Sequence, residues 1–512
     1  MTQRIHITTA ITYSNGAPHV GHAYEYLATD TFARHMRRRL GRENVTFVTG
    51  TDEHGQKNRD AAAKENLDPK SFADKISALF LAAHAGLNIS YDYFVRTTDP
   101  VHQEFVRKML ARSYACGDIY FREYEGLYCV GCERFYTEKE LLPGNVCPEH
   151  NTPAELLKES NYFLKLEKYR ADILAQIEKN RDFIRPERYR NEALKMLAQP
   201  LEDLCISRPK ARLDWGIELP FDDQFVTYVW YDAFWAYLSE LPDTSDAALG
   251  GILPVTGHFI GKDILKTHAV YWPAMLLSVG LPLFRHLNVH GFLTYNGARF
   301  SKSSGNTADP VPYEASIGPD VLRYFLEREV VYGLDGDFSE SRMVERYNAD
   351  LANDLGNLTS RVLAMAARYF VGELTMAPGA NAEDRALCES FAAVASRSGE
   401  QIEALAFNRA LEAIWQTLDV ANKYIVATSP FTLAKDPANL PRVAEILANL
   451  CEGLRVVADT LEPFMPVTSR KILALLNVDE TLAHAPFGEG LKPGHRVNAA
   501  TPLFPRIEKK KV

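Results

Sequence analysis

The sequence predicts an α/β protein in which a parallel-sheet domain carries a cysteine-rich insertion and is followed by an all-helical bundle. Three observations predict this class. A strand, loop, helix, strand pattern at the N-terminus returns after residue 225, a cysteine cluster lies between the two parts, and helical periodicity begins at Asn348. With 512 residues the chain can bury several cores, and its length alone suggests about three domains.

The first part of the chain reads as the opening of a parallel α/β domain. We expect a short buried strand at residues 4–11, a turn at NGAP and a helix over 21–41, followed by a second strand at 44–50. Ligands of such domains bind at the carboxyl ends of strands. The motifs HVGH (19–22) and TDEHG (51–55) both lie at such ends.

The rest of the chain divides into an insertion, a second α/β part and a bundle. Residues 116–225 combine short aromatic strands, a cysteine cluster and a charged helix, which indicates an insertion. The α/β pattern resumes at FVTYVWYDAFWAYL (225–238) and continues through HLNVHGFLTYNG (286–297). From Asn348 nearly every segment predicts helix, with breaks at TSP, AKDPANLP and LEPFMP, as in a bundle joined by short loops.

Charge and hydrophobicity exclude two classes of protein. A net charge of -9 argues against a protein that coats nucleic acid by bulk electrostatics, although a local basic face stays open. The N-terminus lacks the features of a secretion signal. The longest apolar stretch contains Pro273 and Pro282 and is shorter than the roughly 18 to 20 residues that a membrane span needs. We therefore expect a cytoplasmic protein without a membrane segment.

Three of the seven cysteines and one histidine have the spacing of zinc ligands. They form two pairs, each separated by two residues, which flank a fourteen-residue loop, and four nitrogen and sulfur ligands fill a tetrahedral shell. The alternative is two unrelated pairs in a core with an incidental histidine. Because four protein ligands leave no open position, we predict one structural Zn²⁺ per chain. The predicted ligands are Cys129, Cys132, Cys147 and His150, while Cys116, Cys205, Cys388 and Cys451 are expected to be buried small hydrophobes.

The two histidines of HVGH have three possible roles: metal ligands, a catalytic pair, or ordinary polar residues at a helix start. No third metal ligand stands near His19 and His22 in sequence. Gly21 permits a close backbone approach, and a helix start presents N–H groups and a positive dipole to an anion. Phosphate binding therefore fits these residues better than metal binding.

A second loop far downstream suggests the same chemistry. Residues 296–306, NGARFSKSSGN, form a hydroxyl-rich loop between glycines that contains Arg299 and Lys302. A lysine there can neutralise charge on a leaving pyrophosphate, although a solvated loop is the alternative. The two motifs together are more specific than either alone.

HVGH and RFSKS (299–303) resemble the HIGH and KMSKS signatures of the class I aminoacyl-tRNA synthetases, and specifically of the methionyl-tRNA synthetase family. Arg299 and Phe300 depart from the usual Lys-Met, and Lys302 retains the second lysine. The resemblance covers essentially the whole chain. The segments that carry it, in order, are AITYSNGAPHVGH, VTGTDEHG, VWYDAFWAY, GKDILKTHAVYWPAML, VHGF and ADLANDLGNLTSR.

The resemblance implies five domains. They are the first half of a Rossmann-like catalytic domain (1–115), a connective insertion with a zinc knuckle (116–225), the second catalytic half (226–290), a linker domain with the KMSKS loop (291–348) and a helical anticodon-binding domain (349–512). The insertion is too short for the editing domain of the isoleucyl, valyl and leucyl relatives. No appended tRNA-binding module follows the bundle, so we expect a monomer.

The resemblance also implies a two-step reaction. L-methionine and ATP form methionyl-adenylate and pyrophosphate, with Mg²⁺ accompanying ATP, and the methionyl group then passes to the 3′-terminal adenosine of initiator or elongator tRNA(Met). The implied catalytic residues are His19, His22 and Lys302. The implied ATP-binding residues are His19, Gly21, His22, Gly261, Asp263, Arg299, Ser301, Lys302 and Ser303.

Nine residues are implied to bind methionine, with aromatic and aliphatic side chains around the thioether and a carboxylate for the ammonium group. Without the resemblance, the spacing of Trp230 and Tyr237 would indicate core packing, and Asp52 would be a helix cap. The implied residues are Ala10, Ile11, Tyr13, Asp52, Trp230, Ala233, Tyr237, Ile264 and His268.

A polar stripe in the helical part is implied to read the CAU anticodon. Asn353, Asn357 and Arg361 recur every four residues and share one helix face, opposite to a leucine and valine face formed by Leu351, Leu355, Leu358 and Val362. A solvated face is the commoner meaning of such a stripe. In the family the positions of Asn357 and Arg361 read the anticodon, and Phe431 stands where a tryptophan often stacks on a base.

Two other functions are weighed against this one. A small-molecule nucleotidyltransferase can share an HxGH motif and a basic loop, but it needs neither the zinc insertion nor about 160 residues of C-terminal helices. A non-catalytic zinc-containing RNA-binding protein descended from a synthetase is the other. The presence of His19, His22, Asp52 and Lys302 argues against lost catalysis.

Overall fold

A computed structural model describes residues 4–129, 134–136, 140–148, 151–299, 317–379 and 381–507. The chain folds into two compact units. Unit 1 comprises residues 1–18, 40–85 and 90–291, and unit 2 comprises residues 19–39, 86–89 and 292–512. Each unit is described by itself, and the division into five domains stays a prediction.

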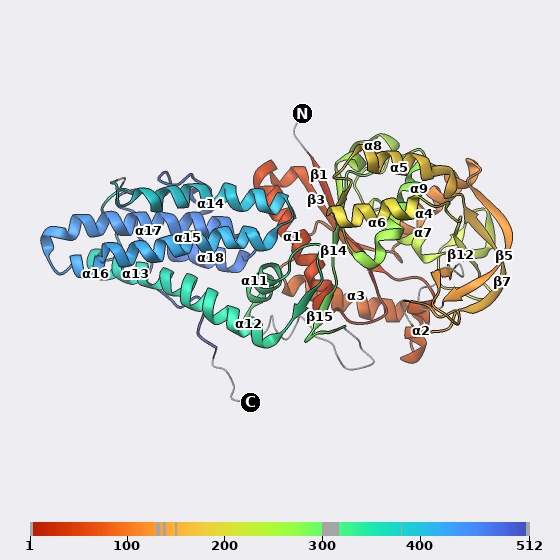
Figure 1. Ribbon diagram of the computed structural model, residues 1–512, viewed down its shortest axis with the longest axis horizontal. Coiled ribbons are helices and arrows are strands. Elements are labelled where there is room, and N and C mark those ends of the chain that lie inside the picture. Colours follow the sequence, from red (N-terminus) through yellow and green to blue (C-terminus); the bar gives the residue numbers. More distant parts are fainter. Residues whose placement is uncertain are drawn as a thin grey trace. The chain divides into compact units, whose positions relative to one another are not determined.

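Unit 1 contains a seven-stranded sheet in which every strand pair is parallel (Figure 1). The order is β2-β3-β1-β13-β14-β8, with β4 beside β3. β3 has the sequence VTFVTGTD and is buried at all but one position, as expected for a parallel strand covered on both faces. The parallel α/β prediction is confirmed. The strands are β1 (Ile5–Thr9), β2 (Thr12–Tyr13), β3 (Val45–Asp52), β4 (Tyr93–Arg96), β8 (Ile184–Arg185), β13 (Thr256–Gly261) and β14 (His286–His290).

Helices connect these strands. Within unit 1, α5 packs against α6 and α9, and α6 also contacts β8. The shared core of unit 1 includes Trp235 and Trp272, both fully buried. The helices are α2 (Gln56–Lys64), α3 (Pro69–Gly86), α4 (Pro100–Ala115), α5 (Arg170–Lys179), α6 (Glu187–Leu197), α7 (Val229–Ala233), α8 (Asp246–Ile252) and α9 (Trp272–Ser278).

The predicted insertion contains two further sheets. One has the order β6-β5-β7-β9 and the other the order β10-β12-β11, and all their pairings are antiparallel. β5 and β7 have eleven and ten residues, so they are longer than the short strands that the sequence predicts. The strands are β5 (Ile119–Cys129), β6 (Arg134–Tyr136), β7 (Glu155–Leu164), β9 (Leu204–Cys205), β10 (Ser207–Pro209), β11 (Glu218–Leu219) and β12 (Asp222–Thr227).

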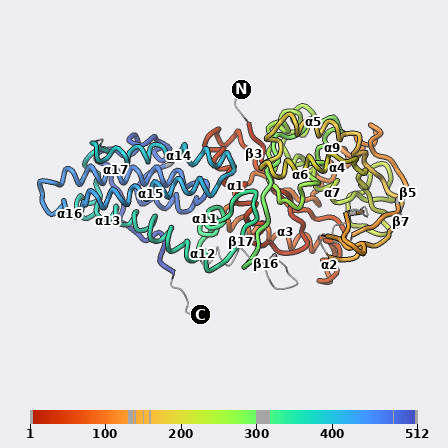
Figure 2. Tube along the Cα trace, in the orientation of Figure 1, coloured from red at the N-terminus to blue at the C-terminus, as the bar shows by residue number. Residues whose placement is uncertain are grey.

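Unit 2 is mainly helical. α17 lies at the centre of its bundle, because α13, α14, α15 and α18 all pack against it (Figures 1 and 2). The predicted bundle is therefore confirmed. The helices are α1 (Val20–Leu40), α11 (Pro319–Glu329), α12 (Glu340–Arg346), α13 (Asn357–Phe370), α14 (Arg385–Glu403), α15 (Phe407–Thr428), α16 (Pro430–Leu433), α17 (Leu440–Leu461), α18 (Pro466–Leu475) and α19 (Glu480–Ala483).

Two features of unit 2 differ from the prediction. The strand after β14 does not continue the parallel sheet: β15 (Leu293–Tyr295) pairs with β16 (Ala298–Arg299) and β17 (Gly336–Phe338) in a small sheet of its own. In addition, Tyr347–Gly356 is a π-helix that leads directly into α13. Hydrophobic periodicity predicts a helix there but does not distinguish π from α geometry over so short a segment.

A buried ionic cluster connects three segments of unit 2. Arg323 on α11 contacts Asp30 on α1 at 2.8 Å, and both side chains are fully buried. Arg323 also donates to the backbone carbonyls of Pro463 and Phe464, each at 2.7 Å. One turn along α11, burial raises the pKa of Glu327 to about 8, although the Arg323 charge opposes the rise.

No helix in the described part of the chain is long and apolar enough to cross a membrane.

Candidate functional site

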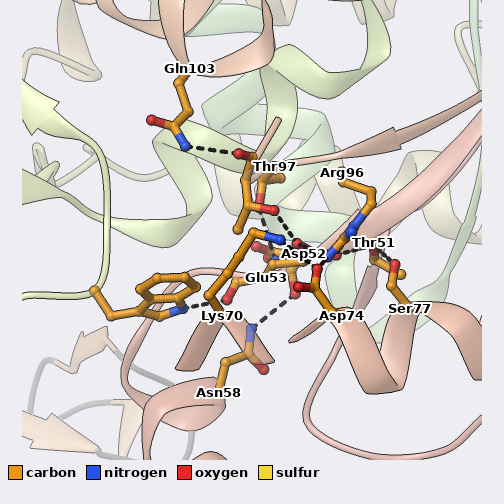
Figure 3. A network of polar contacts seen from close by, with 12 residues as sticks. Thr51, Asp52, Glu53, Asn58, Lys70, Asp74, Ser77, Arg96, Thr97 and Gln103 are labelled. Atoms are coloured by element: carbon orange, nitrogen blue, oxygen red, sulfur yellow. Dashed lines mark hydrogen bonds and ion pairs between the residues drawn. The ribbon is translucent and has the colours of Figure 1, made fainter. Parts of the chain in front are cut away.

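The end of β3 and the loop that follows it belong to a network of polar contacts in unit 1 (Figure 3). Asp52, Glu53 and His54 are all buried, with exposed fractions of 3%, 0% and 4%. The Asp52 carbonyl accepts hydrogen bonds from the Ser14 N–H and from the side-chain amide of Asn58, each at 2.9 Å. The backbone position of Asp52 at the carboxyl end of its strand is therefore fixed from two sides.

Glu53 forms the ionic part of this network. Arg96 on β4 donates to both carboxylate oxygens, at 2.7 and 3.0 Å, and its other contact is Asp74 on α3 at 2.6 Å. The Thr51 hydroxyl and the Trp215 indole N–H donate to the Glu53 carboxylate and carbonyl, at 2.8 and 2.6 Å. Burial lowers the pKa of Arg96, but the bonds to Glu53 and Asp74 outweigh this effect and raise it overall, so the guanidinium stays protonated.

His54 has a different partner, Asp232 on α7. Its Nδ1 lies 2.5 Å from Asp232 Oδ2, and Nε2 of His102 lies 2.7 Å from Asp232 Oδ1. The other nitrogen of His102 contacts the Ser239 hydroxyl at 2.9 Å. Burial raises the pKa of Asp232, but the two imidazoles outweigh burial and lower it, so the carboxylate is ionised.

Two residues implied to bind methionine form a hydrogen-bonded pair. Nδ1 of His268 lies 2.9 Å from the Ile264 carbonyl, which only an N–H can satisfy, so the neutral ring accepts at Nε2. The Tyr237 hydroxyl donates to that Nε2 at 2.8 Å. Burial lowers the pKa of His268 to about 4, so the ring is neutral near pH 7.

Six of the residues implied to bind methionine belong to the large hydrophobic core of unit 1 or pack against it. Ala10 and Tyr237 belong to the core of unit 1, and Ile11, Tyr13, Trp230 and Ile264 pack against it half-buried. The rings of Tyr13 and Trp230 meet edge to face, with centroids 6.0 Å apart. Ala233 is also buried, in α7. The structure thus places all nine residues in unit 1, six of them in or against its core.

Gly261 and Asp263 lie at the end of β13, the strand beside β1. A Cβ at Gly261 would approach the Asp263 carboxylate oxygen to 2.6 Å. Any other residue at position 261 would therefore displace the Asp263 side chain. The backbone of Gly261 and the Asp263 carboxylate therefore lie close together.

The histidines of HVGH lie at the start of α1, in unit 2. The His19 N–H donates to Nδ1 of His22 at 3.2 Å, and the two rings stack with centroids 3.7 Å apart. Because Nδ1 accepts, the neutral His22 ring carries its proton on Nε2. The Nε2–H group of His22, at the start of a helix, is suited to donate a hydrogen bond to a phosphate oxygen. Lys302, Ser301 and Ser303 lie outside the described residues, and only the backbone of Arg299 is described.

The predicted zinc ligands are described in part. Cys129 and Cys147 are buried, and they form a small core cluster with Tyr136. Cys132 and His150 lie outside the described residues. Within the described ranges no group of three or more His, Cys, Asp or Glu side chains has the arrangement of a metal site.

The other cysteines correct one expectation. Cys205 and Cys451 are buried and Cys388 is half-buried, but Cys116 is exposed. Cys116 follows the last residue of α4 in a turn, where the backbone faces solvent.

The polar stripe of unit 2 has the orientation that the sequence predicts. Asn353 and Asn357 are exposed and Arg361 is half-buried. The opposite face is fully buried and consists of Leu351, Leu355, Leu358 and Val362. Phe431 on α16 is 46% exposed, which is unusual for a phenylalanine.

Comparisons with known proteins agree with this architecture. The family model described as "tRNA synthetases class I (M)" matches residues 5–155 and 141–363, and the model described as "Anticodon-binding domain of tRNA ligase" matches residues 384–507. The parallel sheet, its strand-end residues and the helical bundle therefore define a class I aminoacyl-tRNA synthetase.

Individual relatives narrow this class. The methionine–tRNA ligase of Deinococcus radiodurans is 43% identical over 98% of this chain and 74% of its own length. That of Mycobacterium tuberculosis is 42% identical over 98% of both chains. A solved structure of the Mycobacterium tuberculosis methionyl-tRNA synthetase in complex with methionyl-adenylate superposes with a TM-score of 0.93 at 42% identity, covering 98% of this chain and all of that one. This chain belongs to the methionyl-tRNA synthetase family.

Sequence reasoning missed the residues that support Asp52. Glu53 and His54 stand in the quoted motif TDEHG, but their partners Arg96 and Asp232 lie 43 and 178 residues away. Three adjacent polar residues at a strand end are a signal that could have been followed, since buried charges are paired. The identity of the partners needs the fold.

Proposed function

We propose that this chain activates L-methionine with ATP and transfers the methionyl group to tRNA(Met). The methionine carboxylate attacks the α-phosphate of ATP, a new P–O bond forms, and pyrophosphate leaves. The 3′-terminal adenosine hydroxyl of tRNA then attacks the carbonyl carbon and releases AMP. The observation that carries this proposal is that the chain belongs to the methionyl-tRNA synthetase family over nearly its whole length. Six of the residues implied to bind methionine lie in or against the core of unit 1, which is consistent with it.

The residues of the methionine site have separate roles in this proposal. Asp52 binds the ammonium group, since a buried carboxylate at a strand end is stabilised by a cation. Tyr13 and Trp230 contact the thioether, for which aromatic edges are favourable neighbours. The hydrogen-bonded pair of Tyr237 and neutral His268 contributes polar atoms to the methionine site without adding a charge.

Catalysis requires no nucleophile from the enzyme, because the methionine carboxylate is itself the nucleophile. We assign His19, His22 and Lys302 to the phosphates, Gly261 and Asp263 to the nucleoside, and Arg299, Ser301 and Ser303 to the loop that contacts ATP. Mg²⁺ bound with ATP supplies further charge neutralisation. Alignment and electrostatic stabilisation are the physical source of the rate.

We assign one structural Zn²⁺ to Cys129, Cys132, Cys147 and His150. The burial of Cys129 and Cys147 in one small cluster supports this assignment, because thiolates that share a metal lie close together. Metal analysis of the purified protein tests it, with about one zinc per chain expected and loss of zinc in Cys132→Ser. A zinc-free protein with full activity would contradict it.

We assign the stripe of Asn353, Asn357 and Arg361 to the CAU anticodon, together with Phe431. The exposure of the two asparagines supports this assignment, and so does the exposed ring of Phe431, which lies within residues 384–507 that match an anticodon-binding domain. Initiator and elongator tRNA(Met) share this anticodon, so both are expected substrates. That the protein is a monomer stays a prediction, which a mass measurement in solution tests.

Amino-acid-dependent exchange of radiolabelled pyrophosphate into ATP tests the first step. We expect exchange with methionine, followed by charging of a tRNA with a CAU anticodon. A matched reaction with leucine is the control, since it differs in side-chain shape but not in its amine and carboxylate. No exchange with methionine, or faster exchange with leucine, would overturn the proposal.

A further inference from the structure

Asp232 is a fully buried carboxylate between two imidazoles from distant parts of unit 1. Oδ2 contacts Nδ1 of His54 in the loop after β3, and Oδ1 contacts Nε2 of His102 on α4. Side-chain exposure is 0% for Asp232, 5% for His54 and 0% for His102. Both carboxylate oxygens therefore accept a hydrogen bond with water excluded, where such bonds are strong.

This arrangement connects two of the segments that carry residues implied to bind methionine. His54 stands two residues after Asp52, which we assign to the ammonium group. Asp232 stands on α7, two residues after Trp230 and one before Ala233, which we assign to the side-chain pocket. The contact between His54 and Asp232 thus connects the segment assigned to the ammonium group of methionine with the segment assigned to its side chain, although the two residues are 178 positions apart in the chain.

The orientation of each ring is fixed by a second contact. Nδ1 of His102 lies 2.9 Å from the Ser239 hydroxyl, and the His54 ring packs edge to face on Trp215, with centroids 5.2 Å apart. The Trp215 indole in turn donates to the Glu53 carbonyl. Glu53, the residue before His54, is in turn paired with Arg96 at 2.7 Å.

We propose that His54 and Asp232 are positioning residues for methionine: their contact sets the distance between Asp52 and the Trp230–Ala233 segment and thereby sets methionine affinity. This inference rests on the proposed function. A site held in its bound geometry before the substrate arrives loses less entropy on binding. Loss of the contact leaves the Glu53–Arg96 pair intact, so the loop stays folded while its distance from α7 becomes variable.

The chain offers a sharp pair of variants at position 54. In His54→Asn the amide nitrogen occupies the place of Nδ1, so the hydrogen bond to Asp232 is retained. In His54→Gln the amide nitrogen occupies the place of Nε2, so the hydrogen bond to Asp232 is lost. Both variants are neutral amides. We expect the KM for methionine in pyrophosphate exchange to rise about 10- to 100-fold in His54→Gln and His54→Ala, and no more than about threefold in His54→Asn. The KM for ATP is expected to change less than about threefold in all of them.

His84→Ala is the matched control, because it deletes another buried imidazole of unit 1, on α3, whose Nδ1 lies 2.7 Å from the Phe80 carbonyl. It is expected to lower thermal stability without changing the KM for methionine. Melting curves of all variants separate weak binding from unfolding.

Three outcomes decide the inference. Selective loss of methionine affinity in His54→Gln with rescue in His54→Asn supports it. Equal KM values for methionine in the two variants, or parallel losses for methionine and ATP, overturn it. If the wild-type protein shows no methionine-dependent exchange, the proposed function itself fails, and the variants are then compared by direct L-methionine titration followed by calorimetry, where equal affinities again overturn the inference.

Discussion

The loop after β3 in unit 1 and the polar stripe of unit 2 place their functional side chains in different ways. In the loop, Glu53 and His54 are buried and bonded to partners from distant parts of the chain. In the stripe, Asn353 and Asn357 are exposed, and their direction follows from helix geometry over a buried leucine face. The proposed methionine site is thus positioned by buried polar contacts, whereas the direction of the proposed tRNA surface follows from helix periodicity.

This difference predicts separable effects of substitution. Changes in the loop should alter methionine activation and therefore both steps of the reaction. Changes in the stripe should alter only the step that needs tRNA.

Asp52→Ala removes the charge that we assign to the ammonium group. We expect kcat/KM for methionine in pyrophosphate exchange to fall about a thousandfold, because the ammonium group would then be desolvated without a counter-charge. Asp246→Ala is the control, since that carboxylate is 61% exposed and pairs with Arg112 at the surface. Exchange kinetics with Asp52→Ala close to wild type would remove Asp52 from the substrate site.

Arg361→Ala removes the one cation of the stripe in α13. We expect charging of tRNA(Met) to lose about 10- to 100-fold in kcat/KM while pyrophosphate exchange keeps its wild-type rate, because a base contact is worth about 1–3 kcal/mol. Arg409→Ala is the matched control: this exposed arginine lies at the first turn of α15, the end of that helix remote from α16. Equal losses in the two assays would contradict the role of Arg361.

Phe431→Ala tests the aromatic member of the same surface. Loss of one stacked base costs about 1–3 kcal/mol. Because the ring of phenylalanine is smaller than that of tryptophan, we expect an effect near the lower end of this range, a rise of about tenfold in the KM for tRNA. Phe431→Trp is expected to keep or improve tRNA affinity. If Phe431→Ala binds a CAU anticodon stem-loop with wild-type affinity in a titration, this ring does not stack on a base.

Glu327→Gln tests the buried ionic cluster of unit 2 through the pH dependence of its stability. The pKa of Glu327 is raised from 4.5 to about 8, so between these values the unfolded chain ionises the group while the folded chain retains the proton. Wild-type stability therefore falls from this source as the pH rises from about 4.5 to about 8. We expect Glu327→Gln to melt a few degrees higher than wild type at pH 8 and the gain to shrink toward pH 5.

Glu400→Gln is the control for this experiment, since Glu400 is exposed on α14. Its melting temperature should follow that of the wild type at every pH. A gain in Glu327→Gln that does not depend on pH would mean that shape, not charge, explains the effect.

The sequence predicts the two regions unequally. Periodicity places Leu351, Leu355 and Asn357 on the correct faces, because helix geometry is local, although it does not reveal the π-helix over Tyr347–Gly356. The alternation of strands and helices likewise predicts the parallel sheet and the strand-end position of Asp52. These features depend on residues close together in the chain.

The contacts around Asp52 depend on residues far apart. Sequence spacing offers no reason to pair His54 with Asp232 rather than with another carboxylate, since the pairing follows from the packing of α4 and α7 on the sheet. The exposure of Cys116 was missed for a related reason: its burial is decided by where α4 ends. Local pattern predicts elements and faces, and tertiary packing decides partners.

One measurement tests the separation of the two regions most directly: methionine-dependent pyrophosphate exchange and tRNA(Met) charging, assayed in parallel on wild type, Asp52→Ala and Arg361→Ala. We predict that Asp52→Ala loses both activities and that Arg361→Ala loses charging alone. Loss of exchange in Arg361→Ala, or intact exchange in Asp52→Ala, would contradict the account.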